Sequence, residues 1–259
     1  MNRFRDKVIL VTGAGKGIGA ATAELLGREG ASLALFDIDQ KAVSETAERI
    51  TQAGGKAMAL YGDARSSSDV RQAVEAAVRE YKGLDGIAAI AGVLRLTPTE
   101  EVPDEQWREV VETNVKGPFE VIRAALPHLR SRGGGSIVLA SSAMAFASSP
   151  GAALYSASKG ALVSMTMALA VEFAAEGIRV NCVAPGTVRT PMAMALAEWT
   201  RQERAVEDAV EDFGKNHPMG RLIEADEVAN VVAFLLSEEA SAVTGSCYGV
   251  DAGLLANLA

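Results

Sequence analysis

Ser142, Tyr155 and Lys159 have side chains and a spacing that suit proton transfer at an alcohol or carbonyl oxygen. Tyr155 and Lys159 stand four positions apart in a run of small residues that predicts a helix continuing to residue 176, so they share one helix face. A free phenol titrates near pH ~10. A cation beside it favours the phenolate and lowers this pKa, which suits a general acid or base that works near neutral pH.

Ser142 ends a run whose centre, residues 137–140, is apolar and predicts a buried strand. Ligands of open α/β sheets bind beyond the carboxyl ends of the strands. A serine hydroxyl at such a point can hydrogen-bond a substrate oxygen without bringing a charge. Each motif alone has a plainer alternative: a tyrosine and a lysine four apart by chance on an amphipathic helix, or serines in an ordinary turn. The surrounding elements decide between these alternatives.

The segment from Thr12 to Gly19 is rich in glycine and lies between an apolar run over residues 7–11 and a helical pattern over residues 20–29. A strand, a glycine-rich turn and a helix in this order form the context of a dinucleotide-binding fingerprint. Glycines let the backbone approach a pyrophosphate, and the helix N-terminus supplies N–H groups and a positive dipole end. The cofactor-binding residues expected here are Gly13, Gly15, Lys16, Gly17, Ile18 and Gly19.

Asp37 ends the next apolar run, residues 32–36, eighteen residues after Gly19. An acid about twenty residues beyond the glycines binds the ribose hydroxyls of a dinucleotide, and its charge would repel a 2′-phosphate. Lys16 points weakly the other way, since NADP-using proteins with a similar glycine turn have a basic residue before the second glycine. Because Asp37 acts at the discriminating atom, we predict NAD in preference to NADP, with Asp37 and Ile38 in the cofactor site.

On these motifs the chain resembles the short-chain dehydrogenase/reductase family over nearly its whole length. The family's turn, Thr-Gly-x-x-x-Gly-x-Gly, is present from Thr12 to Gly19. Its active serine stands thirteen residues before the tyrosine, which selects Ser142 over Ser141, and its Asn-x-x-Gly motif is present at Asn114. The resemblance implies a nicotinamide-dependent oxidoreductase in which Asn114 holds a water that links Lys159 to solvent.

The resemblance also implies further cofactor contacts. Asp63 corresponds to an acid that contacts adenine. The family usually has two asparagines before the Ala91–Gly92 pair; Ala89 and Ile90 stand there instead, which predicts a strand end without its usual side-chain braces. Residues 185–190 correspond to the segment that orients the nicotinamide. The remaining cofactor-binding residues implied are Ala64, Ala91, Gly92, Tyr155, Lys159, Pro185, Gly186, Val188 and Thr190.

The whole chain, 259 residues with 49% hydrophobic residues, alternates strand and helix patterns without a linker or repeat. Alternating βα units imply a parallel sheet with helices on both faces. We therefore predict a single-domain α/β fold over residues 1–259, a Rossmann-like doubly wound parallel sheet. Its apolar content suffices for a large core, in which Cys182 and Cys247 are expected as small buried residues.

The formal net charge of −8 argues against nucleic acid and anionic membranes as partners. No unbroken apolar run approaches the ~18 residues of a membrane span, and the short apolar run after the N-terminus leads directly into the glycine turn, unlike a signal peptide. We expect a cytoplasmic protein. The two histidines, His128 and His217, lie far apart in the sequence, so no metal site is expected.

Residues 191–221 correspond to the family's variable substrate loop, and their apolar start and charged continuation predict an amphipathic lid over the site. Met192 and Met144, with Phe146 beside it, would give an apolar substrate pocket, although Met144 could equally pack in the core. With Ser142 and Tyr155 at its polar end, such a pocket suits an uncharged, moderately hydrophobic secondary alcohol or its ketone.

Three alternatives stay open: a reductase of 3-oxoacyl thioesters, an isomerase or lyase on the same fold, and a dinucleotide-binding sensor without catalysis. The resemblance also implies a homotetramer that pairs through two long middle helices and through a C-terminal strand at residues 247–250, with the apolar tail 254–259 buried nearby.

Overall fold

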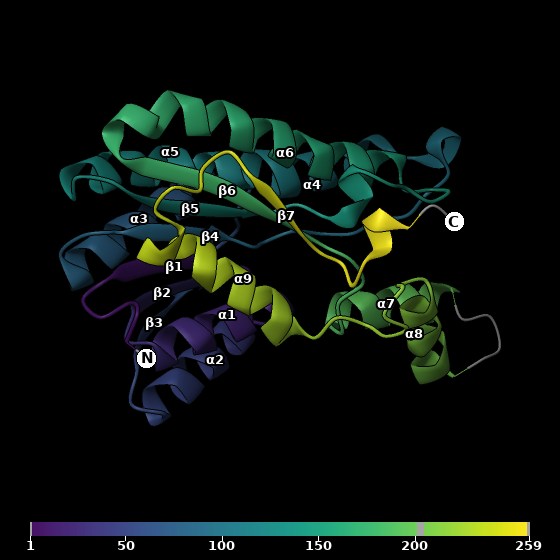
Figure 1. The fold of residues 1–259 in the computed structure, drawn as a ribbon, viewed down its shortest axis with the longest axis horizontal. Helices are drawn as coiled ribbons and strands as arrows, with labels where there is room; N and C mark the ends of the chain where they lie inside the picture. Colours follow the sequence, from purple (N-terminus) through teal and green to yellow (C-terminus); the bar gives the residue numbers. More distant parts are fainter. Residues whose placement is uncertain (1, 201–204, 258–259) are drawn as a thin grey trace.

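The computed structural model describes residues 2–200 and 205–257. Within these ranges one sheet holds seven parallel strands in the order β3-β2-β1-β4-β5-β6-β7 (Figure 1). In chain order the strands are β1 (Val8–Thr12), β2 (Ser32–Asp37), β3 (Lys56–Tyr61), β4 (Gly86–Ala89), β5 (Gly135–Ala140), β6 (Ile178–Pro185) and β7 (Cys247–Val250). The predicted Rossmann-like, doubly wound α/β fold is confirmed.

Helices cover both faces of the sheet (Figure 1). One face carries α1 (Gly17–Arg28), α2 (Gln40–Gln52) and α9 (Ala225–Leu236). The other side carries α3 (Ser67–Tyr81), α4 (Asp104–Val111), α5 (Gly117–Ser131) and α6 (Ala153–Phe173). A separate pair, α7 (Pro191–Thr200) and α8 (Val206–Lys215), lies beyond the carboxyl ends of the strands, on the right in Figure 1.

β1 shows why the strands are almost wholly apolar. Successive side chains of a strand point to opposite faces, so Val8 and Leu10 join the core under α3, α5 and α6, while Ile9 and Val11 join the core under α1, α2 and α9. A parallel sheet covered on both faces needs such continuous hydrophobic runs.

The direction of the chain across the sheet changes between β1 and β4. The chain first moves outward from β1 to β2 and β3, then returns to β4 and continues to β7, and Thr12 and Ala89 are register partners at the carboxyl ends of β1 and β4. The connections leave these two strands in opposite directions, which opens a crevice where such folds bind ligands.

The ends of one helix and two strands are set by the elements next to them. α1 begins at Gly17, inside the glycine turn, and not at residue 20. β4 ends at Ala89 because its partner β1 turns away into the glycine loop after Thr12. β6 reaches Pro185 because its last four residues pair with β7.

The lid, residues 191–221, forms the two helices α7 and α8, with residues 201–204 outside the described ranges. The apolar face of the lid was expected over the active site, and α7 places Met192 and Leu196 there. The apolar face of α8 packs against α7, where Ala197, Val210 and Leu222 form a small core with their neighbours. α7 therefore stands between α8 and the site.

α6 and the turn that follows it, Ala153–Glu176, form one helical segment with the length and hydropathy of a membrane span, the only such segment among the described residues. Its inner face nevertheless belongs to the main core, through Leu162, Leu169 and Phe173. The segment is thus a core helix of the sheet, and its first turns carry Tyr155 and Lys159.

Candidate active site

Two adjoining cavities lie at the carboxyl ends of the strands. The larger, about 500 Å³, extends from the glycine turn past the end of β2. The smaller, about 170 Å³, lies between Ser142, Tyr155 and α7. The two cavities adjoin, and the same five residues line both: Ile18, Ile90, Gly92, Thr190 and Met192.

The glycine turn packs closely on the backbone around it, which only residues without side chains allow. Gly13 and Gly17 have φ angles of +67° and +56°, which favour glycine. A Cβ at Gly13 would lie 2.8 Å from the Ala91 backbone, and one at Gly19 would lie 2.0 Å from the Gly13 carbonyl oxygen. The turn leads into the N-terminus of α1, so this cradle fits the pyrophosphate of a dinucleotide.

Asp37 lies in the larger cavity with its carboxylate held by the backbone. The Gly15 N–H donates to Oδ2 at 2.8 Å, and the Asp39 N–H donates to Oδ1 at 2.9 Å. Lys16 does not stand free beside it: its ammonium donates to Asp39 at 2.7 Å, and this bond keeps the pKa of Asp39 below its ordinary value. The Asp37 carboxylate is therefore fixed in the crevice at the end of β2.

The second basic side chain at this end of the cavity is Arg65, which bonds Asp63 at 2.6 Å. This bond lowers the pKa of Asp63, which stays ionised. Ala64 and Ile38 complete this wall, and the Ile38 side chain, 59% exposed, offers an apolar surface at the rim. Both cations of this wall, Lys16 and Arg65, thus have carboxylate partners.

Ser142, Tyr155 and Lys159 meet in the smaller cavity. Ser142 follows β5, and its Oγ accepts a hydrogen bond from the Met144 N–H at 3.1 Å. The buried Tyr155 lines the same cavity, and hydrogen bonding to Ser142 acts to lower the pKa of its hydroxyl. The Lys159 ammonium donates to the Ala140 carbonyl at 2.7 Å and lies 5.7 Å from the centroid of the Tyr155 ring.

The pKa of Tyr155 differs from the sequence prediction. A lowered value was expected from the Lys159 charge, but burial raises the pKa of Tyr155, and the hydrogen bond with Ser142 offsets this only in part. Burial also lowers the pKa of Lys159, to about 8, because a dry site disfavours the ammonium. Desolvation is the largest cause of both pKa shifts. It depends on how deeply the two side chains are buried, which their spacing in the sequence cannot reveal.

Asn114 is buried in a π-helical turn, Glu112–Lys116, between α4 and α5. Its amide pairs with the backbone of Val93, accepting from the N–H at 2.8 Å and donating to the carbonyl at 2.9 Å, and it donates to Ser158 at 3.0 Å. A Cβ built on Gly92 would lie 3.2 Å from the Lys159 Nζ and 3.3 Å from the Asn114 Oδ1. Gly92 thus lets these two side chains come close together.

Residues 185–190, here called the nicotinamide loop after the role expected for them, lead from the end of β6 to α7, and all but Arg189 line the smaller cavity. A parallel bridge joins Val188 to Ile223, and Thr190 donates to the Val188 carbonyl at 3.2 Å. Across the crevice, the Ala91 N–H donates to the Thr12 hydroxyl at 3.2 Å. This bond braces the strand end that lacks the family's asparagines.

The wall of the smaller cavity opposite Tyr155 is apolar. Met144 and Met192 line it as predicted, together with Leu94, Ala143, Ala193, Leu196 and Leu254. Phe146 does not: its side chain is 56% exposed and lies outside the lining. Leu254 was missed, although it lies in an apolar tail, because the sequence cannot show that the tail turns back over the site.

Comparison with known proteins agrees with this geometry. A family model described as "Enoyl-(Acyl carrier protein) reductase" matches residues 13–255. Cyclohexanol dehydrogenase from Acinetobacter sp. (strain SE19) is 39% identical, covering 96% of this chain and 95% of that protein. Cyclopentanol dehydrogenase from Comamonas sp. (strain NCIMB 9872) is 38% identical, covering 99% of this chain and 100% of that protein.

The chain belongs to the short-chain dehydrogenase/reductase family. The structure of levodione reductase, 32% identical, matches with a TM-score of 0.94 over 98% of this chain and 99% of that one. Membership in this family implies a nicotinamide cofactor, which fits the glycine cradle and the Asp37 carboxylate described above. Among residues 2–200 and 205–257, no group of three His, Cys, Asp or Glu side chains could hold a metal ion.

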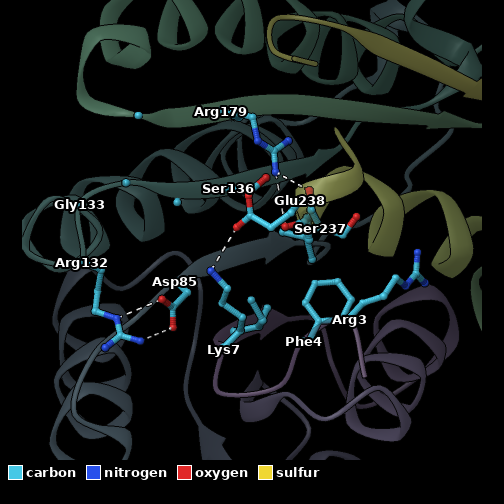
Figure 2. A pocket seen from close by; sticks show the side chains of 15 residues that line it. Arg3, Phe4, Lys7, Asp85, Arg132, Gly133, Ser136, Arg179, Ser237 and Glu238 are labelled. Atoms are coloured by element: carbon cyan, nitrogen blue, oxygen red, sulfur yellow. Dashed lines mark hydrogen bonds and ion pairs between the residues drawn. The ribbon is translucent and has the colours of Figure 1, made fainter. Parts of the chain in front are cut away.

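Another cavity of this short-chain dehydrogenase/reductase, about 230 Å³, lies at the amino ends of the strands, far from the site (Figure 2). Its charged side chains are already paired: Arg132 with Asp85 at 3.0 Å and Lys7 with Glu238 at 3.2 Å. Arg179 donates to carbonyls at the end of α9. The Lys7–Glu238 pair fastens the N-terminal segment to the turn that follows α9, and the contacts together account for the polarity of the cavity.

Proposed function

We propose that this protein is an NAD-dependent dehydrogenase that interconverts a small, uncharged cyclic secondary alcohol and its ketone. One observation carries the proposal: Ser142 and Tyr155 stand together on the wall of an apolar cavity that adjoins a dinucleotide crevice. A secondary alcohol placed there has its oxygen between two hydroxyl groups. The relatives named for cyclohexanol and cyclopentanol support the same class of substrate.

Each polar residue has a distinct role in this proposal. A bound nicotinamide supplies the redox chemistry. Tyr155 takes the hydroxyl proton during oxidation and returns it during reduction, and Ser142 donates a hydrogen bond to the substrate oxygen. Lys159, held by Ala140, keeps a positive charge beside the tyrosine and binds the nicotinamide ribose. Asn114 fixes the backbone of Val93 and holds the water that connects Lys159 to solvent.

The charges around the adenosine end favour NAD over NADP. Asp37, Asp39 and Asp63 face the crevice, and Lys16 and Arg65 are each bonded to one of the last two. Asp37 remains without a cationic partner among these residues. A 2′-phosphate would meet this carboxylate and would have to compete for both cations, which costs binding energy.

The apolar cavity limits the substrate. Among the described residues that line it, Lys159 alone is charged, and its ammonium is already bound to a carbonyl. An anionic substrate would lose its hydration there without a free partner. This favours a neutral ring over a charged acid. The runner-up is a 3-oxoacyl thioester, which the acyl-carrier description of the family model supports.

The purified enzyme should be assayed with cyclopentanol, cyclohexanol, larger cycloalkanols, linear secondary alcohols and a 3-hydroxyacyl thioester, with NAD and NADP in parallel. NADH formation that is fastest with a cycloalkanol supports the proposal. NADP-linked turnover of the thioester would replace it with the acyl-reductase function. Binding of NAD without turnover of any compound would favour the sensor, and product formation without NADH would favour an isomerase or lyase.

A cytoplasmic location and a homotetramer complete the proposal. Phe119 on α5 and Val171 on α6 are 43% and 82% exposed, an unusual position for large apolar side chains on the two long middle helices. Burial of these helices against a second copy would remove that surface from water.

A further inference from the structure

His217 connects the nicotinamide loop to the lid helix α8. The imidazole is 2% exposed, and each of its ring nitrogens meets a backbone group. Nε2 lies 3.1 Å from the Thr187 nitrogen, and Nδ1 lies 3.0 Å from the Phe213 carbonyl oxygen. Thr187 belongs to the nicotinamide loop, while Phe213 belongs to α8.

The two partners determine which nitrogen carries the proton. A backbone N–H can only donate, so Nε2 must accept and be unprotonated, whereas a carbonyl can only accept, so Nδ1 must carry the hydrogen. The neutral imidazole is therefore a bridge with one acceptor end and one donor end. No other side chain places an acceptor and a donor at these two points in one rigid ring.

The bridge lies close against the backbone of the loop. A Cβ built on Gly186 would lie 2.7 Å from Nε2, so the glycine allows the imidazole to approach. The Thr187 N–H that it accepts from is in the wall of the substrate cavity, between Gly186 and Val188. Losing the acceptor would leave this part-buried N–H without its partner and free the loop to shift.

The other end of the bridge leads to the opposite wall of the same cavity. α8 packs on α7 through Val210 and Ala197, and α7 contributes Met192, Ala193 and Leu196 to the lining. A continuous set of contacts thus runs from the nicotinamide loop through His217 to α8 and then to the substrate wall.

We propose that His217 is a positioning residue that ties the nicotinamide loop to the lid, so that lid placement and nicotinamide orientation are set together. The kinetic part of this inference rests on the proposed dehydrogenase function. The imidazole touches neither substrate nor cofactor in this role; it acts through Thr187 on one side and through α8 on the other.

Two substitutions separate the two ends of the bridge. In His217→Gln the amide oxygen can reach the position of Nε2 and still accept from the Thr187 N–H. In His217→Asn the shorter amide nitrogen can replace Nδ1 and still donate to the Phe213 carbonyl. His128→Gln, on the distant end of α5, is the matched histidine control.

Hydrogen–deuterium exchange of residues 185–190 tests the bridge without any turnover. We expect exchange at Thr187 to be at least about tenfold faster in His217→Asn, because one hydrogen bond is lost, and to stay near the wild-type rate in His217→Gln and His128→Gln. Equal acceleration in both His217 variants, or in neither, overturns the proposal.

Kinetics with the best substrate of the panel provides the second readout. His217→Asn should lose about 10- to 100-fold in kcat, since small displacements of reacting groups are costly, while NADH affinity, measured by fluorescence, stays within about threefold because the Asp37 end is untouched. His217→Gln should mainly raise KM for the alcohol. Equal loss of kcat in both variants would reduce His217 to a general stabilising residue. If the wild type turned over nothing, the proposed function would fail while the exchange result still decided the bridge.

Discussion

The Lys159 ammonium lies 5.7 Å from the centroid of the Tyr155 ring and donates a 2.7 Å hydrogen bond to the Ala140 carbonyl. The cation therefore faces the ring, and its position is fixed by a strand end. Both groups are buried, so each resists ionisation: the phenol holds its proton more firmly and the ammonium less firmly than in water. Their opposite shifts lead to measurable effects of pH.

Tyr155→Phe should lower kcat by about 10²- to 10⁴-fold, the usual contribution of a general acid or base. The ring still fills its place, and the crevice residues are unchanged, so NADH should bind as in the wild type. Stopped-flow turnover and fluorescence titration of NADH would measure the two quantities. Turnover within tenfold of the wild type would disprove the role of Tyr155.

Alcohol oxidation should accelerate as pH rises, because Tyr155 must be deprotonated to accept the substrate proton and burial raises its pKa. The Ser142 hydrogen bond lowers that pKa, so its loss in Ser142→Ala should move the rising limb of kcat/KM to higher pH. The pH at half-maximal kcat/KM in the two proteins gives the comparison. An unchanged or lower midpoint in Ser142→Ala contradicts the assignment.

Lys159→Met should abolish activity and yet stabilise the fold below pH 8. The pKa of Lys159 falls from 10.5 to about 8 on folding, so between these values the unfolded chain binds one more proton. Wild-type stability therefore rises with pH across this window, and below it the buried charge costs about 3 kcal/mol.

The Tm difference between Lys159→Met and the wild type should accordingly be largest at pH 7 and shrink towards pH 10. Differential scanning calorimetry at several pH values would measure it. Lys41→Met, whose side chain is 87% exposed, should show no such trend. A difference that stays constant with pH for Lys159→Met would mean that burial does not perturb this lysine.

Asp37→Ser should shift the kcat/KM ratio towards NADP by about 10- to 100-fold, because it removes the carboxylate opposite the 2′-position. Adding Asp39→Ser should increase the shift by releasing Lys16, and serine can keep the helix cap that Asp39 gives to α2. Asp39→Ser alone should shift the ratio less than Asp37→Ser alone. The reverse order would mean that Lys16, and not Asp37, governs cofactor choice.

Met144→Ala should extend the substrate range to larger rings, by about tenfold or more in relative kcat/KM, since a few methylenes in an apolar pocket are worth 1–3 kcal/mol. Phe146→Ala is the matched control because Phe146 points to solvent and lies outside the cavity. Rates across the cycloalkanol series would show the change. Identical profiles for both variants would place Met144 outside the substrate wall.

The local patterns in the sequence were sufficient for the parallel sheet and for the residues at its carboxyl edge. Apolar runs bounded by glycine mark the strands, and motif spacing marks Asp37, Asn114, Ser142, Tyr155 and Lys159. Four of these residues line the two cavities, and the Asn114 side chain lies close to Gly92, which lines both. These features depend on neighbours in the sequence or on a fixed spacing.

Other features depend on contacts between distant segments and could not be predicted. The π-turn around Asn114 is bonded to Val93 and Ser158, which come from other elements. Leu254 reaches the cavity only through the return of the C-terminal tail. The direction in which the pKa of Tyr155 shifts depends on how deeply the side chain is buried, and the spacing of residues in the sequence does not reveal burial.

The position of α9 has a consequence for how the protein is made. Val232 and Leu235 of α9 complete the core that covers Ile9 and Val11 of the first strand, and Arg3 forms an ion pair with Glu239. The core on this face of β1, which α1 and α2 cover in part, thus stays incomplete until residues near the end of the chain have left the ribosome. Synthesis at ~5–20 residues per second leaves the remaining apolar surface exposed for ten seconds or more. A nascent chain of this fold therefore needs protection from aggregation until its last helix docks.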